Sequence, residues 1–403
     1  MPEVSRRAQQ MPASPIRRLM PYAERAKERG IEIIHLNIGQ PDVSSPEQFW
    51  DAVAAARRPV LEYSQSGGEN SLRRRAVEYY RSLGVEVDFD DLLVTTAGSE
   101  ALSFALTCGL NPGDEVIVPE PLYANYLGFS VAAEIKVIPI PTRIEDDFAL
   151  PPTEAFEQRI TSQTKAILIC NPNNPTGTVY DNRQLEELRE IVLEHNLFLI
   201  SDEVYRDFIY SNERPRSVLQ LDGLHDHAIL TDSASKRFSL CGARIGFLVS
   251  RNRNLMGAAL KMAQARLAPP TLDQIGVEAC FDVPQQYFDE VRSEYMKRRD
   301  LLVQRLRAIP GVTCPNSNGA FYAMVRLPID DGDRFCQWLL DSFDVNGKTV
   351  MMAPGSGFYE TPGAGRDEVR IAYVVHQDKL NLAMDILEEA LAAYPGRKVA
   401  VYP

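Results

Sequence analysis

Three short polar segments of this chain carry residue types that can act together in catalysis. They are Asn174–Gly177, Ser201–Tyr205 and Ser233–Lys236. Each follows a short apolar run of the kind that forms a buried parallel strand. Because an open α/β sheet binds its ligands beyond the carboxyl ends of its strands, the pattern predicts that an amide, a carboxylate, a phenol and a lysine meet in one crevice.

Lys236 is the predicted nucleophile of that crevice. A lysine that forms a Schiff base must lose its proton near neutral pH, which requires burial or nearby positive charge. Arg244, eight residues further on, would supply positive charge and an anion site. A solvated surface amine is the ordinary alternative for a lysine. The small and hydroxylic neighbours that follow the strand instead favour a place in the crevice and indicate Schiff-base catalysis.

The elements that must position these residues form an alternating pattern. The apolar runs are 166–170, 197–200 and 228–230, and strand-like and helix-like stretches alternate from about residue 91 to 250. This alternation is typical of a doubly wound, mostly parallel sheet in an α/β protein. Near Pro284 the pattern changes: a long charged helix is predicted over 285–308, strands over 320–326 and 368–374, and a closing helix over 378–393. These elements predict a smaller α+β domain.

Length and composition exclude several classes of protein. The chain has 403 residues, 45% hydrophobic and 24% charged, which fits a globular enzyme of two domains. Its net charge of −12 argues against nucleic acid or an anionic membrane as a partner. No apolar stretch is long enough for a membrane span, and the arginine-bearing N-terminus has no apolar core typical of a secretory signal. A cytoplasmic protein is expected.

The cysteines and histidines do not predict a metal site or a disulfide framework. The six cysteines are widely scattered and form no CxxC motif, which favours reduced thiols. His225 and His227 are the closest histidine pair, and no further ligand cluster accompanies them. We therefore expect no metal.

Six short motifs, in order along the chain, resemble one known family. They include Leu36–Asp42, Thr95–Ala101, the three polar segments above and Glu368–Tyr373. Together they resemble the fold-type I, pyridoxal-phosphate-dependent aminotransferases of class I/II, the aspartate aminotransferase superfamily. The resemblance covers almost the whole chain. It implies an N-terminal segment, 1–43, packed with the small domain, a large cofactor-binding domain, 44–284, and a small C-terminal domain, 285–403.

The resemblance implies roles for the residues of the three polar segments. Lys236 would form the Schiff base with pyridoxal 5′-phosphate, and Asp202 would pair with the pyridine nitrogen and keep the ring an electron sink. A carboxylate at the end of an apolar strand is costly unless it is paired. Asn174 and Tyr205 would donate to the phenolic oxygen. The catalytic residues implied are therefore Lys236, Asp202 and Tyr205.

The cofactor phosphate needs fixed donors. Gly98 and Ser99 open a predicted helix directly after a strand, where backbone N–H groups and the helix dipole favour an anion. By resemblance, Ser233 would add a hydroxyl and Arg244 a bidentate charged contact. Tyr63 resembles the tyrosine that reaches the phosphate of the other subunit, which implies a homodimer with its active sites at the interface.

The remaining implied residues contact the ring or the substrate. Tyr123 matches the aromatic residue that stacks on the pyridine ring. Arg370 matches the arginine that binds the substrate α-carboxylate, a task suited to a planar guanidinium, and Gly39 and Asn174 would also contact the substrate. The arginine that binds a distal carboxylate in the best-known aspartate enzymes has no clear counterpart. Arg266 lies in that region and is the candidate, with a purely structural arginine as the alternative.

These features predict an aminotransferase that exchanges an L-amino acid and a 2-oxo acid by a ping-pong reaction. Aspartate with 2-oxoglutarate is the first expectation, and aromatic amino acids or alanine are alternatives. The same site also supports a C–S β-lyase or a decarboxylase, because the cofactor stabilises a carbanion whichever bond breaks. A binding module without catalysis is a third class, which the presence of every reactive residue type disfavours.

Overall fold

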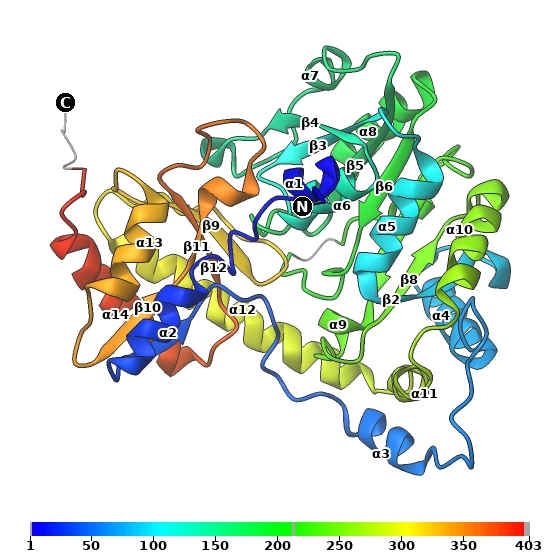
Figure 1. The fold of residues 1–403 in the computed structure, drawn as a ribbon, viewed down its shortest axis with the longest axis horizontal. Coiled ribbons are helices and arrows are strands. Elements are labelled where there is room, and N and C mark those ends of the chain that lie inside the picture. The colour runs from blue at the N-terminus through cyan, green and yellow to red at the C-terminus, as the bar shows by residue number, and fades with distance from the viewer. Residues whose placement is uncertain (1, 212–213, 399–403) are drawn as a thin grey trace.

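The computed structural model describes residues 2–211 and 214–398. The larger of its two parts is built around a central sheet of seven strands (Figure 1). The spatial order of the strands is β2-β8-β7-β6-β5-β3-β4. All neighbours pair in parallel except β8, which is antiparallel to both β2 and β7. The strands are β2 (Leu92–Thr96), β3 (Glu115–Glu120), β4 (Lys136–Pro141), β5 (Thr164–Cys170), β6 (Phe198–Asp202), β7 (Ala228–Ser233) and β8 (Ile245–Val249).

Helices cover both faces of this sheet because its central strands are apolar on both sides. Along β5, Ile167 and Ile169 belong to one hydrophobic cluster, whereas Leu168 and Cys170 belong to the other. One face packs against α4 (Asn70–Ser82), α8 (Asn182–Glu194) and α11 (Thr271–Cys280). The other packs against α5 (Ala97–Gly109), α6 (Asn125–Ala132) and α10 (Arg253–Arg266).

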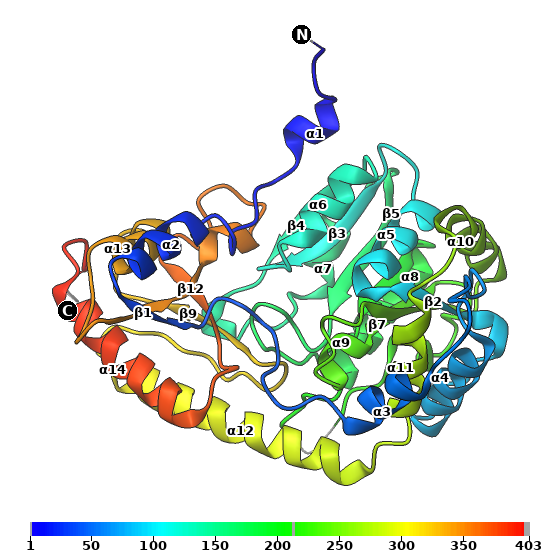
Figure 2. The ribbon, with the colours of Figure 1, turned by 60° about the horizontal axis from the view of Figure 1, so that its bottom comes forward.

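The second part of the molecule combines two small sheets with four helices (Figure 2). Strand β1 pairs in parallel with β10, and β11, β12 and β9 form an antiparallel sheet. The strands are β1 (Glu32–His35), β9 (Tyr322–Arg326), β10 (Lys348–Met351), β11 (Ala353–Pro354) and β12 (Glu368–Ala372). The helices are α2 (Met20–Glu28), α12 (Gln285–Ala308), α13 (Gly332–Asp341) and α14 (Gln377–Ala393).

Three short helices and the N-terminal helix complete the fold. They are α1 (Arg6–Gln10), α3 (Glu47–Ala55), α7 (Thr153–Glu157) and α9 (Ala234–Arg237). Helix α1 contacts α6 of the large part, and Arg7 forms an ion pair of 3.3 Å with Glu134 there. In contrast, α2 packs on α13. The N-terminal segment therefore passes from one part of the molecule to the other.

The fold class predicted from the sequence is confirmed: the protein is an α/β protein with a mostly parallel sheet and a smaller α+β part. Asp202 and Ser233 are the last residues of β6 and β7, and α5 begins at Ala97, two residues earlier than expected. Of the predicted segments 1–43 and 285–403, Met1 and residues 399–403 lie outside the described residues. Within the described ranges, no helix is both long and apolar enough to cross a membrane.

Candidate active site

A cavity of about 520 Å³ opens at the carboxyl ends of β5, β6 and β7, beside the first turn of α5. This place is the one expected for a ligand of a doubly wound sheet. The structure brings to it nearly all of the residues singled out in the sequence. They are Gly39, Gly98, Ser99, Tyr123, Asn174, Asp202, Tyr205, Ser233, Lys236, Arg244 and Arg370.

Lys236 reaches this cavity from α9, the single helical turn that follows β7. Its Nζ donates a hydrogen bond of 2.8 Å to the carbonyl of Gly39 and lies 3.7 Å from the Sγ of Cys241. Burial lowers the pKa of the amine; the positive charges of Arg370 and Arg244 act in the same direction, while Cys241 opposes them. The amine therefore gives up its proton more readily than a surface lysine, which is what a nucleophilic amine requires.

Asp202 ends β6 at the base of the cavity and is buried. The phenol of Tyr126 donates to its Oδ2 at 2.8 Å, and the backbone N–H of Val204 donates to Oδ1 at 3.4 Å. No lysine, arginine or histidine in the described part of the chain forms an ion pair with this carboxylate. Burial accordingly raises the pKa of Asp202 to about 6. A buried carboxylate with only neutral donors is suited to a cationic ligand atom.

Tyr126 was not singled out in the sequence, although a signal was present. It follows Tyr123 by three residues, and the two side chains lie on one side of the segment that begins α6. Their rings meet edge to face, with centroids 5.4 Å apart. Tyr123 lines the cavity and accepts a hydrogen bond of 2.7 Å from the Nδ2 of Asn125. Its stacking on a cofactor ring stays a prediction.

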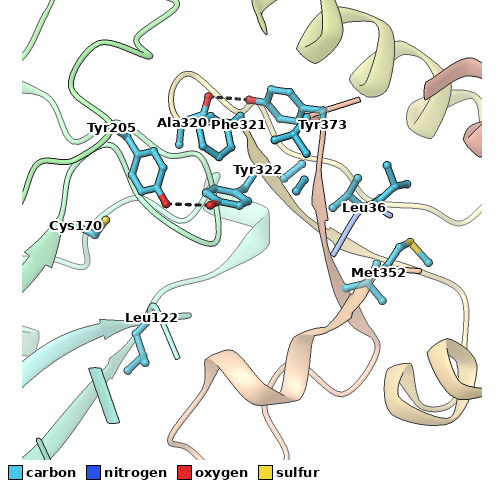
Figure 3. Packing of buried hydrophobic residues seen from close by; sticks show 14 of the residues in the cluster. Leu36, Leu122, Cys170, Tyr205, Ala320, Phe321, Tyr322, Met352 and Tyr373 are labelled. Carbon is cyan, nitrogen blue, oxygen red and sulfur yellow. Dashed lines mark hydrogen bonds between the residues drawn. The ribbon is translucent and has the colours of Figure 1, made fainter. Parts of the chain in front are cut away.

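Two tyrosines from different parts of the molecule meet at the cavity wall. The phenol oxygens of Tyr205 and Tyr322 are 2.9 Å apart, and Figure 3 shows them facing each other. The Nδ2 of Asn174 donates to the phenol of Tyr205 at 3.4 Å. A Cβ at Gly39 would lie 1.7 Å from the phenol oxygen of Tyr322, so a residue without a side chain is required there. Tyr322 was missed in the sequence because its local pattern is that of an apolar strand.

Arg370 enters the cavity from β12 and is only 1% exposed. Its Nη1 donates to the Oδ1 of Asn174 at 3.0 Å and its Nη2 to the carbonyl of Asn37 at 2.6 Å. The guanidinium lies 4.5 Å from the centroid of the Tyr322 ring. Its Nε is buried and has no hydrogen-bond partner within the described residues. A buried guanidinium without a carboxylate is prepared for an anionic ligand group.

A third group of residues forms the end of the cavity at the N-terminus of α5. The backbone N–H of Ala97 donates to the carbonyl of Arg244 at 3.0 Å, so α5 begins beside the turn that carries this arginine. A Cβ at Gly246 would approach the Ala97 backbone within 2.4 Å, which makes a glycine necessary for this close packing. Gly98 and Ser99 follow in the first turn, where free N–H groups attract anions.

The serine hydroxyls at this end of the cavity already form some hydrogen bonds within the chain. The hydroxyl of Ser233 donates to the carbonyl of Ile245 at 3.0 Å and accepts from the backbone N–H of Ser235 at 3.1 Å. Ser235, which was not predicted as a site residue, also lines the cavity. Arg244 is exposed at this end, and its Nη1 donates to the carbonyl of Cys241 at 3.0 Å. The combination of α5 N–H groups, hydroxyls and a guanidinium fits a phosphate.

Two predicted residues lie elsewhere. Tyr63 is 81% exposed, which leaves its predicted contact with another subunit untested. Arg266, at the end of α10, does not line the cavity of its own chain. Its Nε pairs with Glu100 at 3.1 Å and its Nη2 donates to the carbonyl of Val94 at 3.3 Å. Glu100, in the first turn of α5, is thus the ion-pair partner of Arg266 within the described residues, and a contact of Arg266 with a distal carboxylate stays a prediction.

Ile16 and Arg17 line the cavity without having been expected there. They belong to the N-terminal segment between α1 and α2. No local sequence signal marks them, because a basic residue near an N-terminus is ordinary and only the course of the chain brings it to the site.

Comparisons with known proteins agree with this geometry. The family model for aminotransferase class I and II matches residues 31–387. An aspartate aminotransferase from Pyrococcus horikoshii is 31% identical over 94% of this chain and 94% of its own, and an aromatic-amino-acid aminotransferase from Thermococcus litoralis is 31% identical over 96% and 98%. The solved aspartate aminotransferase from Thermus thermophilus with maleate superimposes with a TM-score of 0.87 at 28% identity, over 97% of this chain and 100% of that one.

Proposed function

Because this chain belongs to the class I and II aminotransferases, we propose that its cavity binds pyridoxal 5′-phosphate and moves an amino group from an L-amino acid to a 2-oxo acid. One observation carries the proposal. The cavity holds a buried carboxylate without a cation, Asp202, and a half-buried lysine without a carboxylate, Lys236. Such groups are costly unless a ligand partners both of them.

The residues present fit each part of that cofactor. Asp202 would hold the protonated ring nitrogen, and the amine of Lys236 would bind the cofactor covalently. Asn174 and Tyr205 would donate to its phenolic oxygen. The first turn of α5 with Arg244 would hold its phosphate. When bound, pyridoxal 5′-phosphate supplies an electron sink for the pair released when the substrate Cα–H bond breaks.

The chain's own groups then bind the substrate and move the proton. Arg370 would bind the α-carboxylate through the guanidinium edge that bears its free Nε, and its hydrogen bonds to Asn174 and Asn37 fix its orientation. When a substrate is bound, the Nζ of Lys236 would take the proton from Cα. Because its pKa is lowered, a larger fraction of this amine is unprotonated near neutral pH and able to accept that proton. The ring of Tyr322 supports the guanidinium from one side.

We further propose aspartate with 2-oxoglutarate as the substrates, with aromatic amino acids or alanine as alternatives.

The assembly proposed is a homodimer in the cytoplasm, in which Tyr63 reaches the phosphate bound by the partner subunit. Exposed apolar side chains beside Tyr63 support an interface there, since Val60 and Leu61 are 66% and 57% exposed. The domain division 1–43, 44–284 and 285–403 is proposed with it. Pairing of β1 with β10 supports the packing of this part of segment 1–43 with the small domain, whereas α1 contacts α6 of the large part.

The experiment follows the absorbance of the bound cofactor. Each candidate amino acid is added to the holoenzyme until the long-wavelength absorption band of the bound cofactor disappears, and 2-oxoglutarate is then added. Recovery of the band that depends on the oxo acid is the result expected for transamination. Release of pyruvate and ammonia from a β-substituted amino acid would instead identify a β-lyase. Borohydride reduction followed by peptide mapping should place the cofactor on Lys236, and a label on another lysine would overturn that assignment.

A further inference from the structure

The mouth of the cavity contains a cation that the proposed chemistry does not use. Four basic residues line the cavity, and Asp202 is the one carboxylate among the described residues that line it. Lys236, Arg244 and Arg370 have partners in the proposed function: the cofactor carbonyl, its phosphate and the substrate α-carboxylate. Arg17 has none.

Arg17 has no anionic partner within the described part of the chain either. Its guanidinium takes part in no hydrogen bond or ion pair there, although the adjacent Arg18 pairs with Asp333 and donates to the hydroxyl of Ser356 at 3.2 Å. The two neighbouring arginines therefore differ. Arg18 attaches the segment to α13 and to Ser356, whereas Arg17 lines the cavity and has no anionic partner there.

The backbone around Arg17 is fixed, so its position at the mouth is a built feature. Pro15 is buried and packs closely on Gly357, where an added Cβ would lie 2.1 Å from the Pro15 Cβ. On the other side of Arg17, Leu19 is buried in the main hydrophobic cluster. The hydroxyl of Ser14 accepts from the Arg17 backbone N–H at 3.3 Å. These contacts hold the turn and leave the guanidinium free to move.

The segment also crosses between the two parts of the molecule. Met11 lies against α6, where a Cβ at Gly128 would be 3.3 Å from its Sδ, whereas Pro15 and Arg18 are attached near α13. Figures 1 and 2 show the chain passing from α1 to α2 along this route. Arg17 therefore lines the cavity from the segment that joins the two parts of the molecule.

We propose that Arg17 determines substrate class by binding the distal carboxylate of a dicarboxylic amino or oxo acid. A substrate held at its α-carboxylate by Arg370 and at its amino group by the cofactor would direct its side chain away from both, and Arg17 is the remaining free cation among the described residues that line the cavity. This role replaces the one expected of Arg266, whose guanidinium is held by Glu100. The inference rests on the function proposed above.

The test compares Arg17→Gln with the matched control Arg18→Gln in the holoenzyme. Arg17→Gln should lower kcat/KM for aspartate and glutamate by about 10- to 100-fold and leave alanine and phenylalanine within about threefold. Arg17→Lys should recover part of the loss, because an ammonium keeps the charge without the bidentate geometry. Arg18→Gln should leave the ratio of aspartate to alanine unchanged.

A binding measurement separates recognition from catalysis. By calorimetry, Arg17→Gln should weaken the binding of succinate by about tenfold and leave butyrate, which lacks the second carboxylate, within about twofold. An equal loss for all four amino acids, a loss greatest for phenylalanine, or unchanged succinate binding would overturn the inference while leaving the proposed function intact. Absence of transamination by the unchanged enzyme with every amino acid would overturn the proposed function and this inference together.

Discussion

The deep end and the mouth of the cavity hold their charges in different ways. At the deep end, Asp202 and Arg370 are buried and fixed by hydrogen bonds: Asp202 accepts one from Tyr126, and Arg370 donates to Asn174 and to the backbone carbonyl of Asn37. At the mouth, Arg17 is exposed between the buried Pro15 and Leu19, and its guanidinium has no partner within the described chain.

This difference separates the chemistry from the choice of substrate. Buried groups held in place need no reorganisation during the reaction and act on every substrate alike. An exposed guanidinium on a fixed backbone contacts only those substrates whose side chains reach it. We therefore expect changes at the deep end to affect all substrates equally and changes at the mouth to affect them selectively.

The largest expected effect comes from Lys236→Ala. Because one amine serves as both the covalent attachment and the proton carrier, turnover should fall at least about a thousandfold with every amino acid. The cofactor should still bind through the phosphate and ring contacts. Turnover is measured with aspartate and alanine in parallel, and a loss confined to one of them would contradict the division between the two ends.

Asp202→Ala should have the next largest effect. The protein should fold and bind cofactor weakly, since the remaining contacts are intact, but transaminate about a hundredfold more slowly or worse. Steady-state rates with saturating cofactor measure this loss. Near-normal turnover would mean that another residue holds the ring nitrogen.

The pH dependence of stability tests the environment of Asp202 without the cofactor. Its pKa is about 6 in the folded protein and 3.8 in the absence of structure, so the folded state binds this proton more tightly. Its contribution to stability is full below the lower value and is lost as the pH rises through 6. Against Asp202→Asn, the cofactor-free wild type should therefore gain about 1 kcal/mol in unfolding free energy at about pH 5 relative to about pH 8. A pH-independent difference between the two proteins would contradict this.

Arg266→Ala should show the smallest effect on selectivity. Because its guanidinium is held by Glu100 and the Val94 carbonyl, its loss should lower the melting temperature and leave the ratio of kcat/KM for aspartate to that for alanine within about twofold. A selective loss for aspartate would restore Arg266 as the reader of the distal carboxylate and argue against Arg17.

The sequence predicted the sheet and the deep end of the site together. Apolar runs such as 166–170 specify buried strands, and polar residues at their carboxyl ends converge because parallel strands share one edge of the sheet. Asp202 and Lys236 were found in this way. The partner of Tyr205 was harder to find. Tyr322 lies on an apolar strand of the other part of the molecule and is indistinguishable from a core tyrosine until the fold brings its phenol to Tyr205.

The sequence by itself therefore determined the fold class, the family and the residues whose chemistry is concentrated in short motifs. The tertiary structure decided which of two arginines faces the cavity. Arg266 lies on a segment where the resemblance placed the substrate, but Glu100, one turn into α5, captures its charge. Arg17 carries no motif, and packing of Pro15 and Leu19 places it at the mouth. What a charged side chain can bind depends on the groups within a few ångströms of it, and only the folded chain determines which groups those are.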